Sequence, residues 1–227
     1  MEKNRNHDVK LLRIMDRACR VFAEKGFHNA SVRDVAAATG TSPAGLYYYF
    51  RSKEELLHMI LEGCLSSLLD RVRSEAAGIL DPATRLKAIV KTHLDHYSRH
   101  GKEMRVLVHE WETLSGPIGE ELRRHMTEYT EVVSGTFAAL YPDRSREELR
   151  AATFGLFGML TWVDQWHKPD RDLPLDLLAD QFSALFLGGF VPRSGDATRR
   201  PESNGNETSK EWTEKNSTPS MLSGPGF

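Results

Sequence analysis

Apolar side chains recur at helical spacing through most of residues 1–190. In the first segment Leu11, Ile14 and Ala18 fall at i, i+3 and i+7, and Gly26 ends the pattern. This spacing places the apolar side chains on one face of a helix. No strand-like alternation and no internal repeat competes with it. We therefore expect an all-α fold of about nine helices.

Glycine and proline mark where these helices stop, because glycine leaves the helical conformation easily and proline cannot continue it. After Gly26, two short helices are expected within Ser31 to Phe50. The longer helices are expected from Ser52 to near Gly78, Pro82 to about His100, Lys102 to about Glu112, Gly119 to Leu140, Arg146 to about His167, and Leu173 to about Leu187.

The most informative segment is residues 31–50, SVRDVAAATGTSPAGLYYYF, where two short helical patterns meet across one glycine. Ser31 is placed to cap the first helix, and Gly40 ends it because glycine accepts the left-handed conformation. Ser42 followed by Pro43 starts the second helix. The pattern predicts a helix-turn-helix, whose second helix presents small residues and phenolic hydroxyls to a groove of DNA.

The flanking residues agree with this interpretation. Leu46 and Phe50, four residues apart, are expected to face inward from the second helix. Ser52 and Glu55 fit a capping box, in which the Ser52 hydroxyl accepts from the Glu55 amide and the Glu55 carboxylate accepts from the Ser52 amide. A long helix should therefore follow directly.

Two runs carry a resemblance to a known family: AxxxFxxxGF from Ala18 to Phe27, and SVRDVAAATGTSPAGLYYYFRSKEEL from Ser31 to Leu56. They resemble the DNA-binding head of the TetR family of transcriptional regulators. The resemblance implies a dimeric regulator, most simply a repressor of a palindromic operator, whose C-terminal domain binds a ligand. We expect residues 1–55 to form the DNA-binding domain and residues 56–190 the ligand-binding and dimerisation domain.

The composition adds three expectations. Residues 191–227 are rich in Ser, Gly, Pro, Asn, Thr and Glu, so we expect a disordered tail. The polar N-terminus has no apolar signal core, and no run approaches the roughly 18 apolar residues of a membrane span, which indicates a cytoplasmic protein. The two cysteines, Cys19 and Cys64, are expected to be buried thiols.

The net charge of −2 is unevenly distributed. Residues 1–55 hold ten Lys and Arg against seven Asp and Glu, whereas residues 56–190 hold fifteen against twenty. A basic head on an acidic body attracts phosphate at the head and repels it elsewhere. The charge pattern therefore directs the head toward DNA.

The resemblance assigns the DNA contacts by position. Small residues at the start of the recognition helix let its backbone approach base edges, tyrosines offer hydroxyls or ring faces, and a lysine at the next helix N-terminus attracts phosphate. The predicted DNA-binding residues are Arg33, Thr41, Ser42, Ala44, Gly45, Tyr47, Tyr48, Tyr49 and Lys53. The alternative for Tyr48 and Tyr49 is that they pack the small head. No Arg or Lys lies between Thr41 and Phe50, so the operator sequence cannot be inferred from this helix.

Large apolar residues in the second domain suggest an effector pocket, because aromatic and Met side chains line apolar cavities well. The predicted ligand-binding residues are Met104, Leu107, Val108, Trp111, Met126, Tyr129, Phe154, Phe157, Trp162 and Trp166. The alternative is that each belongs to the core. The run from Phe154 to Phe190 resembles, more loosely, members that respond to acyl-CoA thioesters. Four cations were weighed as contacts for the coenzyme phosphates: Arg105, Arg123, Arg124 and Lys168.

A second class of function rests on three histidines. His93, His96 and His100 share one side of a helix and suggest a metal-binding protein or enzyme with a merely structural helix-turn-helix. No fourth ligand stands at a recognisable spacing, so we expect no metal. There is also no Walker loop, no dinucleotide-binding glycine motif and no nucleophile paired with a base. We expect neither a cofactor nor an enzyme.

Small residues recur on the penultimate predicted helix, at Ala151, Ala152, Gly155 and Gly158. They allow another helix to approach closely, either within the chain or across a subunit boundary. The family resemblance favours a dimer made by the last two predicted helices.

Overall fold

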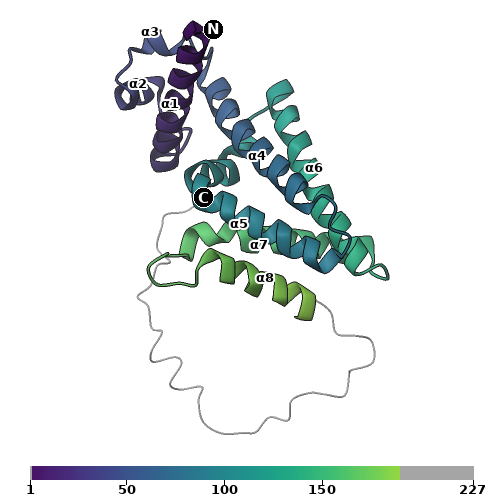
Figure 1. Ribbon diagram of the computed structural model, residues 1–227. Coiled ribbons are helices and arrows are strands. Elements are labelled where there is room, and N and C mark those ends of the chain that lie inside the picture. The colour runs from purple at the N-terminus through teal and green to yellow at the C-terminus, as the bar shows by residue number, and fades with distance from the viewer. Residues whose placement is uncertain (1, 190–227) are drawn as a thin grey trace, which may run out of the picture. The chain divides into compact units, whose positions relative to one another are not determined.

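The computed structural model describes residues 2–189, with side chains from residue 7 to residue 188, and the tail predicted for residues 191–227 lies outside them. Within the described residues the chain forms eight α-helices, one short 3-10 helix and no strand, which confirms the all-α prediction (Figure 1). In chain order the elements are α1 (Glu2–Lys25), α2 (Val32–Thr39), α3 (Pro43–Leu46), α4 (Lys53–Ala76), α5 (Pro82–Glu110), η1 (Trp111–Thr113), α6 (Gly116–Leu140), α7 (Arg146–Trp166) and α8 (Leu175–Gly189).

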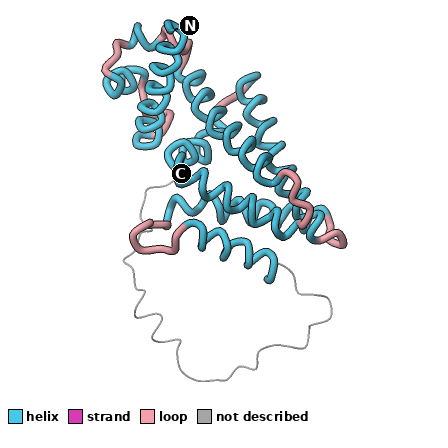
Figure 2. The backbone as a smooth tube through the Cα atoms, in the orientation of Figure 1, coloured by secondary structure: helices cyan, strands magenta, loops and turns pink. Residues whose placement is uncertain are grey.

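The helix boundaries follow the predicted caps. The Ser31 hydroxyl accepts from the Asp34 amide at 3.2 Å, and the Ser42 hydroxyl accepts from the Gly45 amide at 3.1 Å. Gly40 has φ 65° in the left-handed region, where a side chain would add strain. The turn between α2 and α3 is therefore fixed by these three residues, as the sequence predicts. Short loops join most of the other helices as well (Figure 2).

Three local predictions differ from the structure. The recognition helix α3 ends at Leu46, and the chain then turns through residues 47–49, although Leu46 and Phe50 are both buried as expected. The Glu55 carboxylate accepts from the Arg51 amide and not from the Ser52 amide, so only half of the predicted capping box forms. The carboxylate reaches one residue further back than the motif assumes.

The third difference concerns α5. The helices predicted on either side of Gly101 are one helix with a kink, because His100 has non-helical angles of φ −126° and ψ 31°. Backbone hydrogen bonding resumes after this residue. The two predicted segments are therefore joined, and α6 also begins three residues before the predicted Gly119, at Gly116.

Helix α5 is the centre of the body and contacts α1, α4, α6, α7 and α8. Its buried face includes Leu86, Val90 and Leu94, which are almost fully excluded from solvent. The predicted boundary at residue 55 falls inside α4, which runs from the head into the body without interruption. One long helix and one central helix thus connect the two predicted parts.

Both cysteines are buried and reduced, as predicted. Burial, with smaller contributions from Glu103 and Asp16, raises the pKa of the Cys19 thiol to about 12. Burial likewise raises the pKa of Cys64. No helix among residues 2–189 is long and apolar enough to cross a membrane.

Candidate DNA-binding and effector-binding sites

The start of α2 is held against the end of α1. The Asp34 carboxylate accepts from the Lys25 ammonium at 2.5 Å and from the Ser31 amide at 2.8 Å. The hydrogen bond from Lys25, followed by those from Ser31, lowers the pKa of Asp34. Together with the Ser31 cap these contacts complete a capping box, whose acidic member the sequence analysis did not identify. The spacing of Ser31 and Asp34 was the available signal.

The start of α3 presents a nearly bare backbone. Ser42 and Ala44 are exposed, and Thr41 and Gly45 are half-buried. A Cβ atom added at Gly45 would lie 3.0 Å from Thr41 Cγ2 and 3.2 Å from Ser42 Oγ, so any side chain there is tightly confined. The predicted close approach of this backbone to a partner is compatible with that arrangement.

The three tyrosines after α3 have different environments. Tyr47 and Tyr48 are 53% and 74% exposed. Tyr49 is half-buried, with its ring stacked on His7 at 4.9 Å between centroids and the Lys10 ammonium 5.8 Å away. Tyr47 and Tyr48 are therefore available to a partner, whereas much of Tyr49 packs against α1, which was the alternative considered for it.

Lys53 is engaged within the head. Its ammonium donates to the carbonyls of Phe27 at 2.8 Å and Ala30 at 2.9 Å, and it lies 4.2 Å from the Phe27 ring centroid. In this conformation it ties α4 to the turn after α1. A phosphate contact by Lys53, as predicted from its position at a helix N-terminus, would have to be made in addition to these bonds or in place of them.

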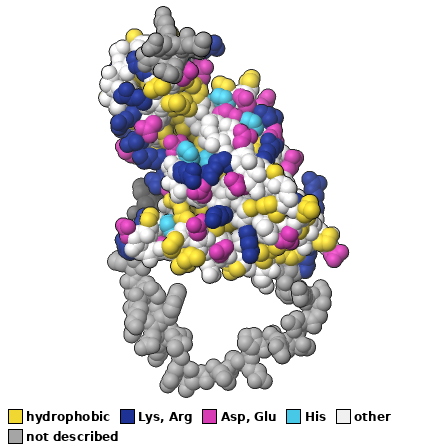
Figure 3. Space-filling view, viewed as in Figure 1, with side chains coloured by type: hydrophobic (Ala, Val, Ile, Leu, Met, Phe, Trp, Pro, Cys, Tyr) yellow, Lys and Arg dark blue, Asp and Glu magenta, His cyan; other side chains and the backbone are white. Residues whose placement is uncertain are grey.

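Basic side chains also line the outside of the head. Arg33 is exposed on α2, and Figure 3 shows further Lys and Arg side chains along one edge of the head. The head thus combines an exposed recognition helix with positive charge, the two features that a helix-turn-helix needs to approach DNA.

The body contains a cleft of about 890 Å³ between α6 and α7. Trp111, Met126 and Phe154 from the predicted ligand-binding set line it, together with Leu149 and several small polar residues. Its volume falls in the range of small-molecule sites, which are typically apolar with a few polar groups.

The rest of the predicted set is distributed elsewhere. Met104, Val108 and Trp162 line a smaller cleft of about 80 Å³ between α5 and α7. Leu107 and Tyr129 are buried in the core, and the half-buried Phe157 ring packs 5.2 Å from Tyr129. Trp166 is 40% exposed and lines neither cleft. Helical spacing alone could not separate core, cleft and surface positions in this domain.

Of the four cations weighed for coenzyme phosphates, Arg123 lines the large cleft. Arg105 instead forms a bidentate pair with Asp164, at 2.7 and 3.0 Å, and Arg124 donates to Glu128 at 2.6 Å. Lys168 is exposed in the loop after α7. The sequence analysis missed Arg146 and Arg150, whose i, i+4 spacing on α7 brings both to the cleft.

The three histidines do not form an open face. His93 Nδ1 lies 2.7 Å from the Tyr129 hydroxyl, and His96 Nε2 lies 3.7 Å from Cys64 Sγ. Burial, with a smaller effect of His96, lowers the pKa of His93 to about 3, and burial lowers that of His96 to about 4. Among the described residues no group of His, Cys, Asp and Glu side chains is arranged to hold a metal.

Helices α7 and α8 expose a continuous set of apolar and small residues. Gly155 and Gly158 face open space, and Trp162 on the same side of α7 is 64% exposed. Leu177 and Leu185 are exposed on α8. Packing within the chain does not use these positions, so the small-residue pattern is free to serve an interface with another chain.

A helix-turn-helix joined by a continuous helix to an α-helical body with an apolar cleft defines a ligand-responsive transcriptional regulator. Residues 14–60 match the family model of bacterial regulatory proteins of the tetR family, and residues 80–190 match that of the tetracyclin repressor-like C-terminal domain.

Individual proteins agree with the family models. A TetR-family regulator from Bordetella parapertussis 12822 is 32% identical, with 78% of this chain and 95% of that chain covered and a TM-score of 0.75. AibR, solved in complex with isovaleryl coenzyme A and operator DNA, is 26% identical over 78% of this chain and 97% of that chain, with a TM-score of 0.69. The HTH-type transcriptional repressor KstR2 of Rhodococcus jostii (strain RHA1) is 29% identical over 186 residues, which cover 78% of this chain and 89% of that protein.

The chain belongs to the TetR family of bacterial transcriptional regulators. It is a DNA-binding, ligand-responsive regulator, and the relatives described above are regulators as well. The metal-binding alternative is not favoured, because its histidines are enclosed in the core.

Proposed function

We propose that this protein is a cytoplasmic repressor that binds a two-fold symmetric operator as a dimer and releases it when an acyl-CoA thioester enters the body. The observation that carries the proposal is the pairing of an exposed recognition segment with an Arg-bordered apolar cleft in one chain. The names of KstR2, a repressor, and of AibR, solved with an acyl-CoA and operator DNA, support it.

The DNA-binding surface is proposed to consist of the start of α3 and its neighbours. Thr41, Ser42, Ala44 and Gly45 would approach the base edges, while Tyr47 and Tyr48 would contact phosphate or thymine methyl groups. Arg33 and Lys53 would contact the backbone, and Tyr49 would contribute mainly by supporting its neighbours from α1. Because the described recognition residues include no guanidinium, specificity should depend on small side chains and hydroxyls.

The effector is proposed to lie in the large cleft between α6 and α7. Trp111, Met126 and Phe154 would contact the acyl chain. Arg123, Arg146 and Arg150 give the cleft three cations suited to the phosphates of coenzyme A. The Arg150 guanidinium lies 4.6 Å from the Phe154 ring centroid, so polar and apolar contacts would be adjacent.

Dimerisation is proposed to use the exposed face of α7 and α8. A two-fold axis there would pair the open glycine positions of one chain with those of its partner. The two heads would then have to reach successive major-groove faces about 34–36 Å apart, or a multiple of that spacing. An effector that prefers another head spacing would release the DNA.

The test begins with selection of a duplex from a random pool by the wild-type protein, which should yield a two-fold symmetric sequence. The complex is then titrated with a series of acyl-CoA thioesters, the matching free acids and coenzyme A alone. We expect release by a thioester and not by coenzyme A. Arg150→Gln should weaken the response, whereas Arg144→Gln, outside the cleft, should not.

Two outcomes would contradict different parts of the proposal. If selection gives no preferred duplex, the repressor function is wrong. If the duplex is found but none of the thioesters releases it or quenches Trp111 fluorescence, only the acyl-CoA assignment is wrong, because the DNA surface rests on the head alone.

A further inference from the structure

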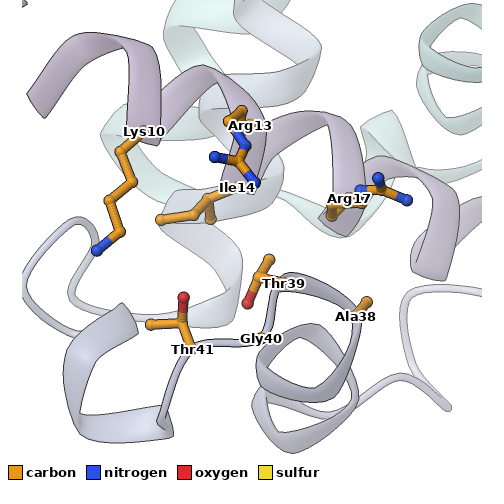
Figure 4. A pocket seen from close by; sticks show the side chains of 8 residues that line it. All are labelled: Lys10, Arg13, Ile14, Arg17, Ala38, Thr39, Gly40 and Thr41. Carbon is orange, nitrogen blue, oxygen red and sulfur yellow. The ribbon is translucent and has the colours of Figure 1, made fainter. Parts of the chain in front are cut away.

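Three cations form a strip along α1. Lys10, Arg13 and Arg17 are spaced at i, i+3 and i+7, and all three are exposed. A helix rises about 1.5 Å per residue, so the strip is about 10 Å long. Figure 4 shows the three side chains spaced along α1 across from Thr41, Thr39 and Ala38. We call these three residues the α1 strip.

The α1 strip borders a hollow of about 290 Å³ beside the helix-turn-helix. Its other lining residues are Ile14, Ala38, Thr39, Gly40 and Thr41, so no acidic residue lines it. The hollow is therefore a concave surface with three positive charges on one wall and the turn between α2 and α3 on the other. Such a surface favours a partner that carries several closely spaced negative charges.

The charges of the α1 strip are largely uncompensated. Among the side chains described, from residue 7 to residue 188, Lys10 and Arg13 form no ion pair with a carboxylate. Arg17 lies 4.0 Å from Asp16, which is closer to Arg20 at 3.2 Å. Elsewhere on the surface most basic side chains that contact an acid hold it more closely, as Lys25 holds Asp34 at 2.5 Å.

The α1 strip is continuous with the proposed DNA-binding surface. Thr41, which lines the hollow, directly precedes the cap of the recognition helix. At the other side Lys10 lies 5.8 Å from the Tyr49 ring, and His7, one helical turn before it, contacts Tyr48 at 5.6 Å. A duplex seated on α3 would therefore pass beside the strip.

We propose that the α1 strip binds the phosphodiester backbone of operator DNA that flanks the half-site read by α3. This inference rests on the proposed function, since it extends the same DNA interface. Duplex DNA carries one charge per about 1.7 Å of axis, so a strip about 10 Å long can meet two or three phosphates. The contact would add affinity and salt dependence without adding sequence preference.

The experiment uses the duplex selected by the wild-type protein, in two lengths. The short form holds the two half-sites over about 20 bp, and the long form adds about 10 bp, one helical turn, on each side. The test variant is Lys10→Gln/Arg13→Gln/Arg17→Gln. The matched control is Lys91→Gln/Arg99→Gln/Arg124→Gln, which removes three exposed positive charges from the body.

The wild type and the control should bind the long duplex more tightly than the short one. The test variant should lose this preference and bind the long duplex at least tenfold more weakly at physiological salt. Its slope of log affinity against log salt should fall by about two to three units, at about 0.9 per lost phosphate contact. Thermal midpoints should match the wild type, because all three side chains are on the surface.

An unchanged salt slope for the test variant on the long duplex would overturn the assignment of the α1 strip while leaving the proposed function intact. Altered base preference in a repeated selection would also overturn it, because backbone contacts carry no sequence information. If the wild type binds neither duplex, the proposed function and the strip are both wrong.

Discussion

Glu110 accepts a hydrogen bond from the backbone amide of Phe27, with 2.9 Å between the amide nitrogen and Oε1. The contact joins the last turn of α5 to the turn after α1. Trp111, the next residue, lines the large cleft, and the Phe27 carbonyl accepts from Lys53 at the start of α4. One short chain of contacts thus connects the candidate effector site with the helix that carries the head.

Glu110→Ala should loosen the head without unfolding it. Loss of the carboxylate leaves the Phe27 amide without this partner, so its hydrogen exchange should become at least tenfold faster. Glu112→Ala, exposed two residues later, is the control and should leave that amide unchanged. Equal exchange rates in the two variants would show that Glu110 does not hold the turn.

Gly45→Glu should reduce operator affinity at least tenfold, because it places bulk and negative charge at the start of the recognition helix. The added Cβ also meets Thr41 at 3.0 Å, so the thermal midpoint should fall as well. Gly45→Ala separates the two effects, since it adds the same Cβ without charge. Binding by Gly45→Glu as tight as that of Gly45→Ala would remove this position from the interface.

Lys53→Ala should lower the free energy of unfolding by about 1–3 kcal/mol, because two backbone carbonyls lose a charged donor. If Lys53 also contacts phosphate, the salt slope of DNA binding falls by about one unit for all sequences alike. Urea unfolding measures the first effect and binding titrations the second. A stability loss with an unchanged salt slope would assign Lys53 a purely structural role.

Gly158→Arg should convert the dimer to a monomer. The position faces open space within the chain, so the side chain fits the isolated subunit but would block a close approach of two α7 helices. Gly63→Arg, also at an open helical glycine, is the matched control. Sedimentation should show a smaller species for Gly158→Arg only, and a dimer in both variants would move the interface elsewhere.

Acid should destabilise the protein through His93. Its pKa is lowered from 6.5 to about 3 by burial, so between these values the unfolded chain binds a proton that the folded chain does not. The free energy of unfolding therefore falls as pH drops below about 6.5, by about 1.4 kcal/mol per unit for this group. His93→Gln should lose less stability between pH 7 and pH 5 than the wild type does. The exposed His28→Gln is the control and should follow the wild type.

The sequence by itself determined the all-α class and the helix-turn-helix. Ser31, Gly40, Ser42 and Pro43 act through their own backbone and nearest neighbours, so their roles can be predicted from local chemistry. The same holds for the family, whose signature lies in this local segment.

The tertiary structure decided which large apolar residues of the body serve which purpose. Trp111, Tyr129 and Trp162 look alike in a helical pattern, yet one lines the cleft, one is buried and one is exposed. Which face of a helix is covered depends on neighbours far away in the chain. The pairing of Arg105 with Asp164 and the engagement of Lys53 with Phe27 are likewise long-range contacts, which no local spacing encodes.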